Sequence, residues 1–428
     1  MTPPRPVAVY GGRRIPFARS NTAYADASNQ DMLTTTLQAV ADAFDLHGER
    51  IGEIAAGAVL KHSRDYNLTR ESALSTTLSP ASAAFDVQMA CGTGLQAAVT
   101  VANKIALGQI DSAIAGGVDT TSDAPLALDE GLRHLLLRAN RARSFGARAK
   151  LFAGFRPRML RPHVPSNGEP RTGLSMGEHT ELMVKEWGIT RAAQDELAYA
   201  SHRNAAAAWE AGFFDDLVVP YRGLTRDNNL RTDISLERLG ALSPVFDRTS
   251  GRGTLTAGNS TPLTDGASAV LLGTESWGAE RGLHPLAYVI DAETAAVDFA
   301  GPGPEGLLMA PAYAVPRLLA RNGLTLQDID VYEIHEAFAG QVLCTLAAWE
   351  DADYCRTRLG LDAPLGPIDR AKLNIKGGSL ATGHPFAATG GRILAGTAKI
   401  LHERGGGTAL ISVCAAGGLG VTALLKAA

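Results

Sequence analysis

The sequence predicts a layered α/β fold, and three observations lead to this class. Short apolar runs typical of buried strands alternate with segments whose apolar residues recur at helical spacing. A chain of 428 residues is too long for one simple core, so two or three compact lobes are expected. The last quarter of the chain also echoes a helix–strand unit of the first quarter, which indicates two duplicated halves in α-β-α-β-α layers.

The first half of the chain alternates strands and helices. Apolar spacing predicts strands at 7–10, 54–60 and 112–116 and helices at 31–44 and 95–107. From about residue 121 helical pieces are separated by proline- and arginine-rich connections, as in an insertion packed over the first lobe. Alternation resumes at 269–272. The chain therefore divides into an N-terminal half (1–120 plus 259–280), an inserted loop domain (121–258) and a C-terminal half (281–428).

Composition excludes several classes of protein. The net charge of −4 gives no global case for nucleic-acid binding. Four cysteines without paired short spacings fit neither a zinc motif nor a disulfide framework, which favours a reducing compartment. The N-terminus carries no apolar signal core and no uncharged apolar run is long enough to span a bilayer, so we expect a cytoplasmic protein.

Cys91 is the first candidate for chemistry. It precedes an Ala/Val-rich segment that is typical of a helix, and so lies at, or one residue before, a helix N-terminus, where free N–H groups and the helix dipole favour a thiolate. Gly92 and Gly94 allow another backbone or a ligand to approach closely. The alternative is a buried, inert cysteine.

His384 and Cys414 occupy the matching unit near the C-terminus. His384 precedes Pro385, which we expect at the first position of a helix that continues over 391–403. Cys414 ends a strand expected at 408–414. If the halves are related by a pseudo-twofold axis, Cys91 and His384 lie at equivalent helix starts and meet. A hydrogen-bonded histidine and a buried strand-end cysteine are the alternatives.

Five segments together resemble the thiolase superfamily over essentially the whole chain. They are Cys91-Gly-Thr-Gly94, Gly258-Asn-Ser-Thr-Pro-Leu-Thr-Asp-Gly-Ala267, His335-Glu-Ala-Phe338, Gly383-His-Pro385 and Cys414-Ala-Ala-Gly-Gly418, in the family's order. The resemblance implies that Cys91 is the nucleophile, His384 its base and Cys414 a second acid/base. It also implies two oxyanion holes, one from His384 with a water held by His335, the other from the backbone N–H groups of Cys91 and Ala416.

Two departures from the common family pattern narrow the expected activity. His335 replaces an asparagine and Ala416 a glycine, a combination similar to the β-subunits of fatty-acid-oxidation trifunctional enzymes. This resemblance implies a degradative 3-ketoacyl-CoA thiolase (acetyl-CoA C-acyltransferase) that acts on medium or long chains in fatty acid β-oxidation. Coenzyme A is then a co-substrate, with no permanently bound cofactor and no metal.

Binding of CoA is carried over to four positions. By resemblance Thr261 contacts the pantetheine, Met176 and Phe338 line its tunnel, and Arg226 lies near the nucleotide. Core packing is the alternative for Met176 and Phe338, because tunnel walls and cores use the same residue types.

A basic stretch between residues 133 and 163 contains nine arginines and lysines and no acid: Arg133, Arg138, Arg141, Arg143, Arg148, Lys150, Arg156, Arg158 and Arg161. Such a segment can lie on an anionic membrane surface, dock an acidic partner, steer CoA phosphates or simply be solvated. The resemblance adds a homodimer or dimer of dimers and a hydratase/dehydrogenase partner subunit, with peripheral membrane contact through this stretch. We expect no nucleic-acid partner.

Three other functions stay open. A 3-ketoacyl synthase of the same fold lacks the second cysteine, so Cys414 argues against it. A biosynthetic acetoacetyl-CoA thiolase is disfavoured by His335 and the basic stretch. A non-catalytic acyl-CoA-binding or scaffold subunit is disfavoured because all four catalytic positions carry usable side chains.

Overall fold

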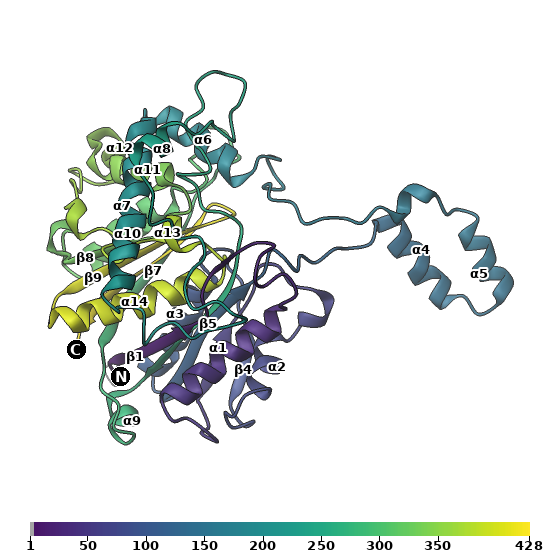
Figure 1. Cartoon of the computed structure of the whole chain (residues 1–428), viewed down its shortest axis with the longest axis horizontal. Coiled ribbons are helices and arrows are strands. Elements are labelled where there is room, and N and C mark those ends of the chain that lie inside the picture. The colour runs from purple at the N-terminus through teal and green to yellow at the C-terminus, as the bar shows by residue number, and fades with distance from the viewer. Residues whose placement is uncertain (1–3) are drawn as a thin grey trace.

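The computed structural model describes residues 4–428 and is built on one ten-stranded sheet (Figure 1). The strand order is β4-β3-β5-β6-β1-β7-β10-β9-β8, with short β2 paired to β6. The strands are β1 Val7–Arg14, β2 Ala18–Arg19, β3 Glu53–Ala56, β4 Ala83–Asp86, β5 Ser112–Asp119, β6 Thr264–Gly273, β7 Ala287–Ala296, β8 Val331–Ile334, β9 Thr408–Ala415 and β10 Leu419–Ala427.

The sheet consists of two halves with the same strand order. Counted outward from the centre, the order is β1-β6-β5-β3 on one side and β7-β10-β9-β8 on the other, and the first half adds β4 at its edge. Each half thus places its first strand, its last strand, the one before the last, and then an earlier strand (β3 or β8). In both, the last two strands are antiparallel and the next pair is parallel. The first strands, β1 and β7, pair antiparallel and join the halves. The expected duplicated α/β layers are thus confirmed.

Two helices, α3 and α14, lie between the halves of the sheet. Helix α3 contacts β5 and β3 of the first half and β10 of the second, while α14 contacts β6 and β1 as well as β9 and β10. They cross almost backbone to backbone: a Cβ atom on Gly390 would lie 2.2 Å from the backbone nitrogen of Leu95, and one on Gly94 would lie 2.5 Å from the carbonyl oxygen of Ala387. Only glycine allows this approach, which brings the two helix starts together.

The outer layers complete the fold. Helices α1 and α2 cover the first half of the sheet and α10 covers the second. Within the described residues, no helix is both long and apolar enough to cross a bilayer. The α-helices are α1 Asn29–Ala43, α2 Leu68–Leu74, α3 Thr93–Ala106, α4 Glu130–Arg141, α5 Phe145–Phe152, α6 Met176–Glu186, α7 Arg191–Glu210, α8 Leu236–Gly240, α9 Glu275–Ala279, α10 Ala310–Arg321, α11 Ala339–Glu350, α12 Ala352–Thr357, α13 Ser379–Thr382 and α14 Ala388–Arg404; short 3₁₀ turns are η1 Ser63–Asp65, η2 Pro157–Leu160, η3 Leu326–Asp328 and η4 Arg370–Lys372.

The inserted segment differs from the prediction in its packing. Helices α6 and α7 pack on α11, and α7 also packs on α13, so this part covers the C-terminal half rather than the first lobe. Helices α4 and α5 project from the body as a separate hairpin (Figure 1). The domain boundaries proposed at 120, 258 and 280 stay predictions.

Most predicted elements are present, and their errors have local causes. The strand expected at 54–60 ends at Ala56, because the N–H groups of Val59 and Leu60 donate to the Asp119 carboxylate instead of to a neighbouring strand. Pro385 does not open a helix, since α14 begins at Ala388.

Candidate active site

Cys91 lies in a tight turn between β4 and α3. The preceding residue, Ala90, has a φ of +45°, a left-handed conformation that a non-glycine residue adopts only when its surroundings enforce it. Thr93 supplies that constraint: its hydroxyl donates to the carbonyl of Ala90 at 2.7 Å and accepts from the N–H of Met89 at 2.8 Å. Because α3 begins at Thr93, Cys91 stands two residues before the helix, one further out than predicted.

His384 faces Cys91 from the other half of the molecule. It lies in the loop between α13 and α14, and its Nε2 atom is 3.1 Å from the Cys91 sulfur. Its Nδ1 atom is 2.6 Å from the hydroxyl of Thr389, and its backbone N–H donates to the hydroxyl of Thr264 at 3.2 Å. Thr389 therefore fixes one ring nitrogen and Thr264 fixes the backbone, so that Nε2 is left for the thiol.

His335 completes a group of three side chains. It follows β8, and its ring centroid lies 4.2 Å from that of His384. Its Nδ1 atom is 2.9 Å from the hydroxyl of Ser379, whereas its buried Nε2 atom has no hydrogen-bond partner among the described residues. One donor atom each of Cys91, His335 and His384 lie within 4.8 Å of one another.

Cys414 lies near the end of β9, and Ala416 lies in the turn between β9 and β10. The Cys414 side chain is buried, and burial together with the neighbouring Cys91 raises its pKa well above the usual value. The backbone N–H of Ala416 lies close enough to the Cys91 sulfur to act against the rise of its pKa. All the residues that the resemblance assigned to catalysis therefore meet at one point.

The pKa values of Cys91 and His384 differ from those expected for a thiolate and its protonated base. Burial raises the pKa of Cys91 to about 12, against the opposing hydrogen bond from Ala416. Burial, with the positive charge of Arg392, lowers the pKa of His384 to about 3, and the pKa of His335 is also lowered, mainly by burial. Desolvation outweighs the helix start, so the resting pair is a neutral thiol that donates to a neutral imidazole.

The same three donors are the only set of metal-ligand type that the described residues bring together. A cysteine sulfur and imidazole nitrogens are donors that Zn²⁺ binds. The hydrogen bond between Cys91 and His384 already engages two of them, and a metal-free reaction stays a prediction.

The predicted CoA residues fall into two places. Phe338 and Cys414 belong to one apolar cluster, against which Met176 packs, and the Phe338 ring meets that of Phe246 edge-on at 5.8 Å. Thr261 joins this group, since its N–H and hydroxyl both donate to the carbonyl of Ala337. Their contact with CoA stays a prediction.

Arg226 is not brought into this group. Its exposed guanidinium lies over the ring of Trp209, 5.3 Å from the centroid, and Trp209 belongs to a different apolar cluster. The place of Arg226 near the nucleotide stays a prediction.

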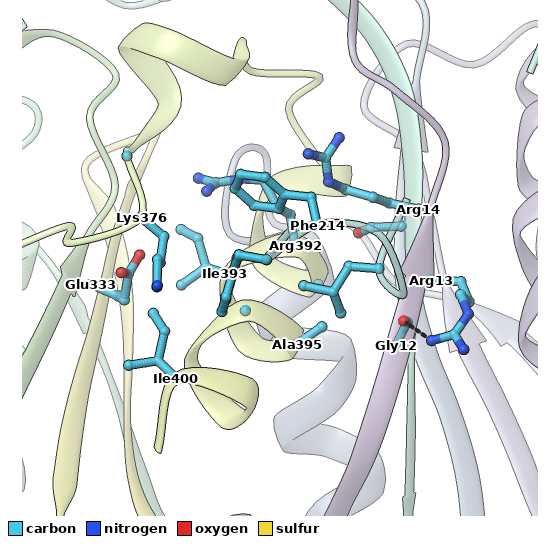
Figure 2. Close-up of a pocket in the computed structure, with 16 residues that line it drawn as sticks. Gly12, Arg13, Arg14, Phe214, Glu333, Lys376, Arg392, Ile393, Ala395 and Ile400 are labelled. Atoms are coloured by element: carbon cyan, nitrogen blue, oxygen red, sulfur yellow. Dashed lines mark hydrogen bonds between the residues drawn. The ribbon is translucent and has the colours of Figure 1, made fainter. Parts of the chain in front are cut away.

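Several buried residues near the site were not identified from the sequence. Arg392 of α14 is directed into a cavity beside Glu333 and Lys376 (Figure 2), and its guanidinium donates to Ser379 at 3.0 Å. Asp119, at the end of β5, accepts from the N–H of Ala387 at 2.9 Å and so holds the loop that carries His384. The only signal for Asp119 was an acid placed directly after an apolar strand.

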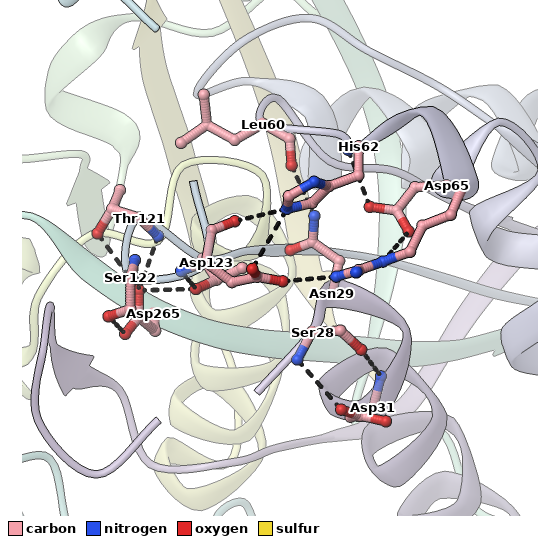
Figure 3. A network of polar contacts seen from close by, with 12 residues as sticks. Ser28, Asn29, Asp31, Leu60, His62, Asp65, Thr121, Ser122, Asp123 and Asp265 are labelled. Carbon is pink, nitrogen blue, oxygen red and sulfur yellow. Dashed lines mark hydrogen bonds and ion pairs between the residues drawn. The ribbon is translucent and has the colours of Figure 1, made fainter. Parts of the chain in front are cut away.

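The 258–267 segment has a structural role in fixing the insertion. Asp265 accepts from the N–H groups of Thr121 and Ser122, at 2.7 and 3.1 Å (Figure 3). These bonds tie the first residues of the insertion to β6, the strand that follows it. Thr264, the first residue of β6, accepts the hydrogen bond from the backbone N–H of His384.

Comparisons with known proteins agree with this geometry. Residues 7–276 match the family model for the thiolase N-terminal domain and residues 283–427 match that for the thiolase C-terminal domain. A 3-ketoacyl-CoA thiolase of Pectobacterium carotovorum is 43% identical over 428 residues, which cover 98% of this chain and 96% of that protein. A 3-ketoacyl-CoA thiolase of Yersinia pestis is 40% identical over 426 residues, with the same shares.

Two solved structures share the whole architecture. A Bacillus anthracis acetyl-CoA acetyltransferase superposes with a TM-score of 0.82 at 28% identity, over 100% of both chains. Human mitochondrial 3-ketoacyl-CoA thiolase superposes with a TM-score of 0.80 at 27% identity, over 99% of both. With both family domains matched along nearly its full length and the expected side chains gathered at one site, the chain belongs to the thiolase family.

Proposed function

We propose that this protein is a 3-ketoacyl-CoA thiolase, which cleaves a 3-ketoacyl-CoA with CoA to acetyl-CoA and an acyl-CoA shortened by two carbons. The observation that carries the proposal is the contact of Cys91 with His384 on one side and its proximity to Cys414 on the other. Relatives at 40–43% identity that bear this name support the substrate class over that of a biosynthetic acetoacetyl-CoA thiolase.

The first half-reaction starts from the neutral pair. As the Cys91 sulfur bonds to the 3-keto carbon, its proton passes to Nε2 of His384 and the carbonyl electrons move to oxygen. When the C=O bond reforms, the C2–C3 bond breaks and its electron pair remains on the acetyl-CoA carbon. The Cys414 thiol protonates that carbon, which leaves an acyl thioester on Cys91 and a thiolate on Cys414.

The second half-reaction restores the enzyme. The Cys414 thiolate takes the proton of the incoming CoA thiol, and the CoA sulfur attacks the thioester. Cys91 leaves as the new acyl-CoA forms and recovers its proton from His384. The low pKa of His384 suits this last step, because its imidazolium gives up a proton readily.

Two sets of donors suit the negative oxygens formed in these steps. The N–H of Ala416, which lies near the Cys91 sulfur, and that of Cys91 itself serve the thioester oxygen, and the imidazoles of His384 and His335 lie beside the other position. Preorganised donors of this kind are each worth about 10²–10³-fold in rate.

The test is CoA-dependent cleavage of 3-ketoacyl-CoA substrates of increasing chain length. We expect turnover on medium and long chains, and its loss in Cys91→Ala. Cys355→Ala is the matched control, since that buried thiol donates only to the carbonyls of Ala348 and Trp349. Turnover confined to acetoacetyl-CoA would favour the biosynthetic alternative. CoA binding without turnover on any chain would favour the scaffold alternative.

We also propose the wider setting that the family resemblance implies: a cytoplasmic homodimer or dimer of dimers that acts in β-oxidation beside a hydratase/dehydrogenase partner subunit. Size-exclusion chromatography with light scattering, with and without such a partner, tests the assembly. A monomer that is fully active would contradict it.

For the α4–α5 hairpin we propose contact with an anionic membrane surface. All nine basic residues of the 133–163 stretch are exposed, and among the described residues only Arg133 has an acidic partner, Glu130 at 2.8 Å. Apolar side chains stand beside them, with Phe145 87% and Leu160 66% exposed. A projecting element that presents both cations and apolar tips suits the interface of an anionic bilayer.

Co-sedimentation with vesicles tests the hairpin. We expect binding to vesicles containing phosphatidylglycerol, little binding to pure phosphatidylcholine, and weakening by salt. Arg138→Gln combined with Arg141→Gln and Phe145→Ser should reduce binding while leaving thiolysis intact. Equal binding to both vesicle types, or none, would contradict the proposal.

A further inference from the structure

A partly buried arginine and a buried serine lie next to His335. Arg392 belongs to α14, and its terminal nitrogen lies 3.0 Å from the Ser379 hydroxyl oxygen. A guanidinium carries only donors, so in this hydrogen bond the Ser379 oxygen is the acceptor. The direction of the bond is therefore fixed by chemistry.

Among the described residues, the proton of the Ser379 hydroxyl has one side-chain acceptor within reach. Besides Arg392, the only side-chain partner of this hydroxyl among the described residues is Nδ1 of His335, at 2.9 Å. A buried hydroxyl proton left without an acceptor costs about 1–3 kcal/mol. The serine therefore donates to Nδ1, and an Nδ1 atom that accepts cannot also carry hydrogen in the neutral ring.

The proton of the neutral His335 ring then resides on Nε2. That atom is buried and has no hydrogen-bond partner among the described residues, and the centroid of its ring lies 4.2 Å from that of His384, with the two planes tilted by 47°. Nε2 is thus an unpaired donor beside the reacting sulfur, in a place where the substrate oxygen or a water that contacts it can accept.

We propose that Ser379 and Arg392 are positioning residues that lock His335 in its Nε2–H tautomer, so that a donor always faces the reaction site. The tautomer follows from the contacts alone, whereas its value for catalysis rests on the proposed thiolysis.

The positive charge of Arg392 also favours a neutral His335 ring. It lies close enough to His335 and His384 to lower the pKa of both rings, in addition to the larger effect of burial. Burial lowers the pKa of Arg392, and the nearby Glu333 and Glu336 oppose part of that lowering. A neutral His335 ring carries one N–H, and the hydrogen bond from Ser379 to Nδ1 places that N–H on Nε2.

Neutron diffraction from crystals of the deuterated native protein reads the tautomer directly. We expect a deuteron on Nε2 of His335 and none on Nδ1, and the Ser379 deuteron directed at Nδ1. A deuteron on Nδ1 would overturn the proposal, whatever the activity of the protein. Because this readout needs no turnover, failure of the thiolysis assay would leave the tautomer result standing on its own.

Kinetics of matched variants test the consequence. Ser379→Ala should lower kcat about 10–100-fold with little change in KM for CoA, and Ser379→Thr, which keeps the hydroxyl, should recover most of the loss. Ser201→Ala is the control. The buried Ser201 hydroxyl donates to Glu336 and accepts from the N–H of Gly378, the residue before Ser379, but it makes no hydrogen bond to His335. A kcat for Ser379→Ala equal to that of Ser201→Ala would overturn the positioning role.

Discussion

The sulfur of Cys91 lies 3.1 Å from Nε2 of His384, although 293 residues separate them in the chain. The two residues belong to different halves of the molecule. Cys91 lies two residues before α3 and His384 four residues before α14, and these two helices cross between the halves of the sheet. The contact therefore depends on the crossing of α3 and α14, not on any local feature of either motif.

The neutral state of this pair predicts how Cys91 reacts with pH. Since burial raises the pKa of the thiol to about 12, alkylation of free enzyme by iodoacetamide should accelerate nearly tenfold per pH unit from pH 7 to 9, without a plateau. Mass spectrometry should locate the label on Cys91, and Cys91→Ser gives the background rate. A rate that is flat across this range would indicate a preformed thiolate–imidazolium pair and contradict the assignment.

Cys414 should matter for turnover far more than a neighbouring buried thiol. Cys414→Ala removes the acid that protonates the departing carbon, and general acid–base catalysis contributes about 10²–10⁴-fold. Cys344→Ala in α11 belongs to the same apolar cluster and should cost stability, roughly 1 kcal/mol, but not kcat. Steady-state kinetics and thermal unfolding of the two variants separate these effects. Comparable kcat values would remove Cys414 from the mechanism.

Two glycines of α14 should respond in opposite ways to alanine. A Cβ on Gly390 would lie 2.2 Å from the backbone nitrogen of Leu95, so Gly390→Ala must push the helices apart, at a cost of about 1–3 kcal/mol. Gly396 has no atom within 4 Å of its Cβ position, so Gly396→Ala should stabilise by about 0.5–1 kcal/mol.

Urea denaturation measures both changes, and the activity of Gly390→Ala reports whether His384 has moved from Cys91. Equal stability of the two variants would show that the crossing is not limited by the backbone contact.

Burial of His384 predicts a loss of stability in acid. Its pKa is about 3 in the folded protein and about 6.5 when unfolded. Between these values the unfolded chain binds the proton and the folded protein does not, so the free energy of unfolding falls by about 1.4 kcal/mol per unit as the pH drops below about 6.

The comparison with His384→Asn isolates this contribution. The raised pKa values of Asp119, about 7, and Glu333, about 8, act in the opposite sense, but they do so in both proteins. The parent should therefore lose more stability than the variant between pH 6.5 and 5 in urea titrations, whereas His402→Asn, at an exposed site of α14, should follow the parent. Parallel curves for His384→Asn and the parent would refute a buried neutral histidine.

The fold class, the repeat and the residue types of the site could all be predicted from the sequence. Periodicity places α1, α3 and β9 within a few residues, because amphipathic patterns are local properties of the chain. The motifs around Cys91, His384 and Cys414 likewise carry their chemistry in the residue types.

The protonation states of those residues and the contacts that set them depend on the tertiary structure. The helix start at Cys91 suggested a thiolate, yet desolvation by the opposite half of the molecule keeps the thiol protonated. Arg392 and Ser379 carried no motif, and their role follows from where α13 and α14 set them, behind His335. Burial, the direction of hydrogen bonds and the packing of the insertion on the C-terminal half are properties of contacts between distant segments, which a local pattern does not encode.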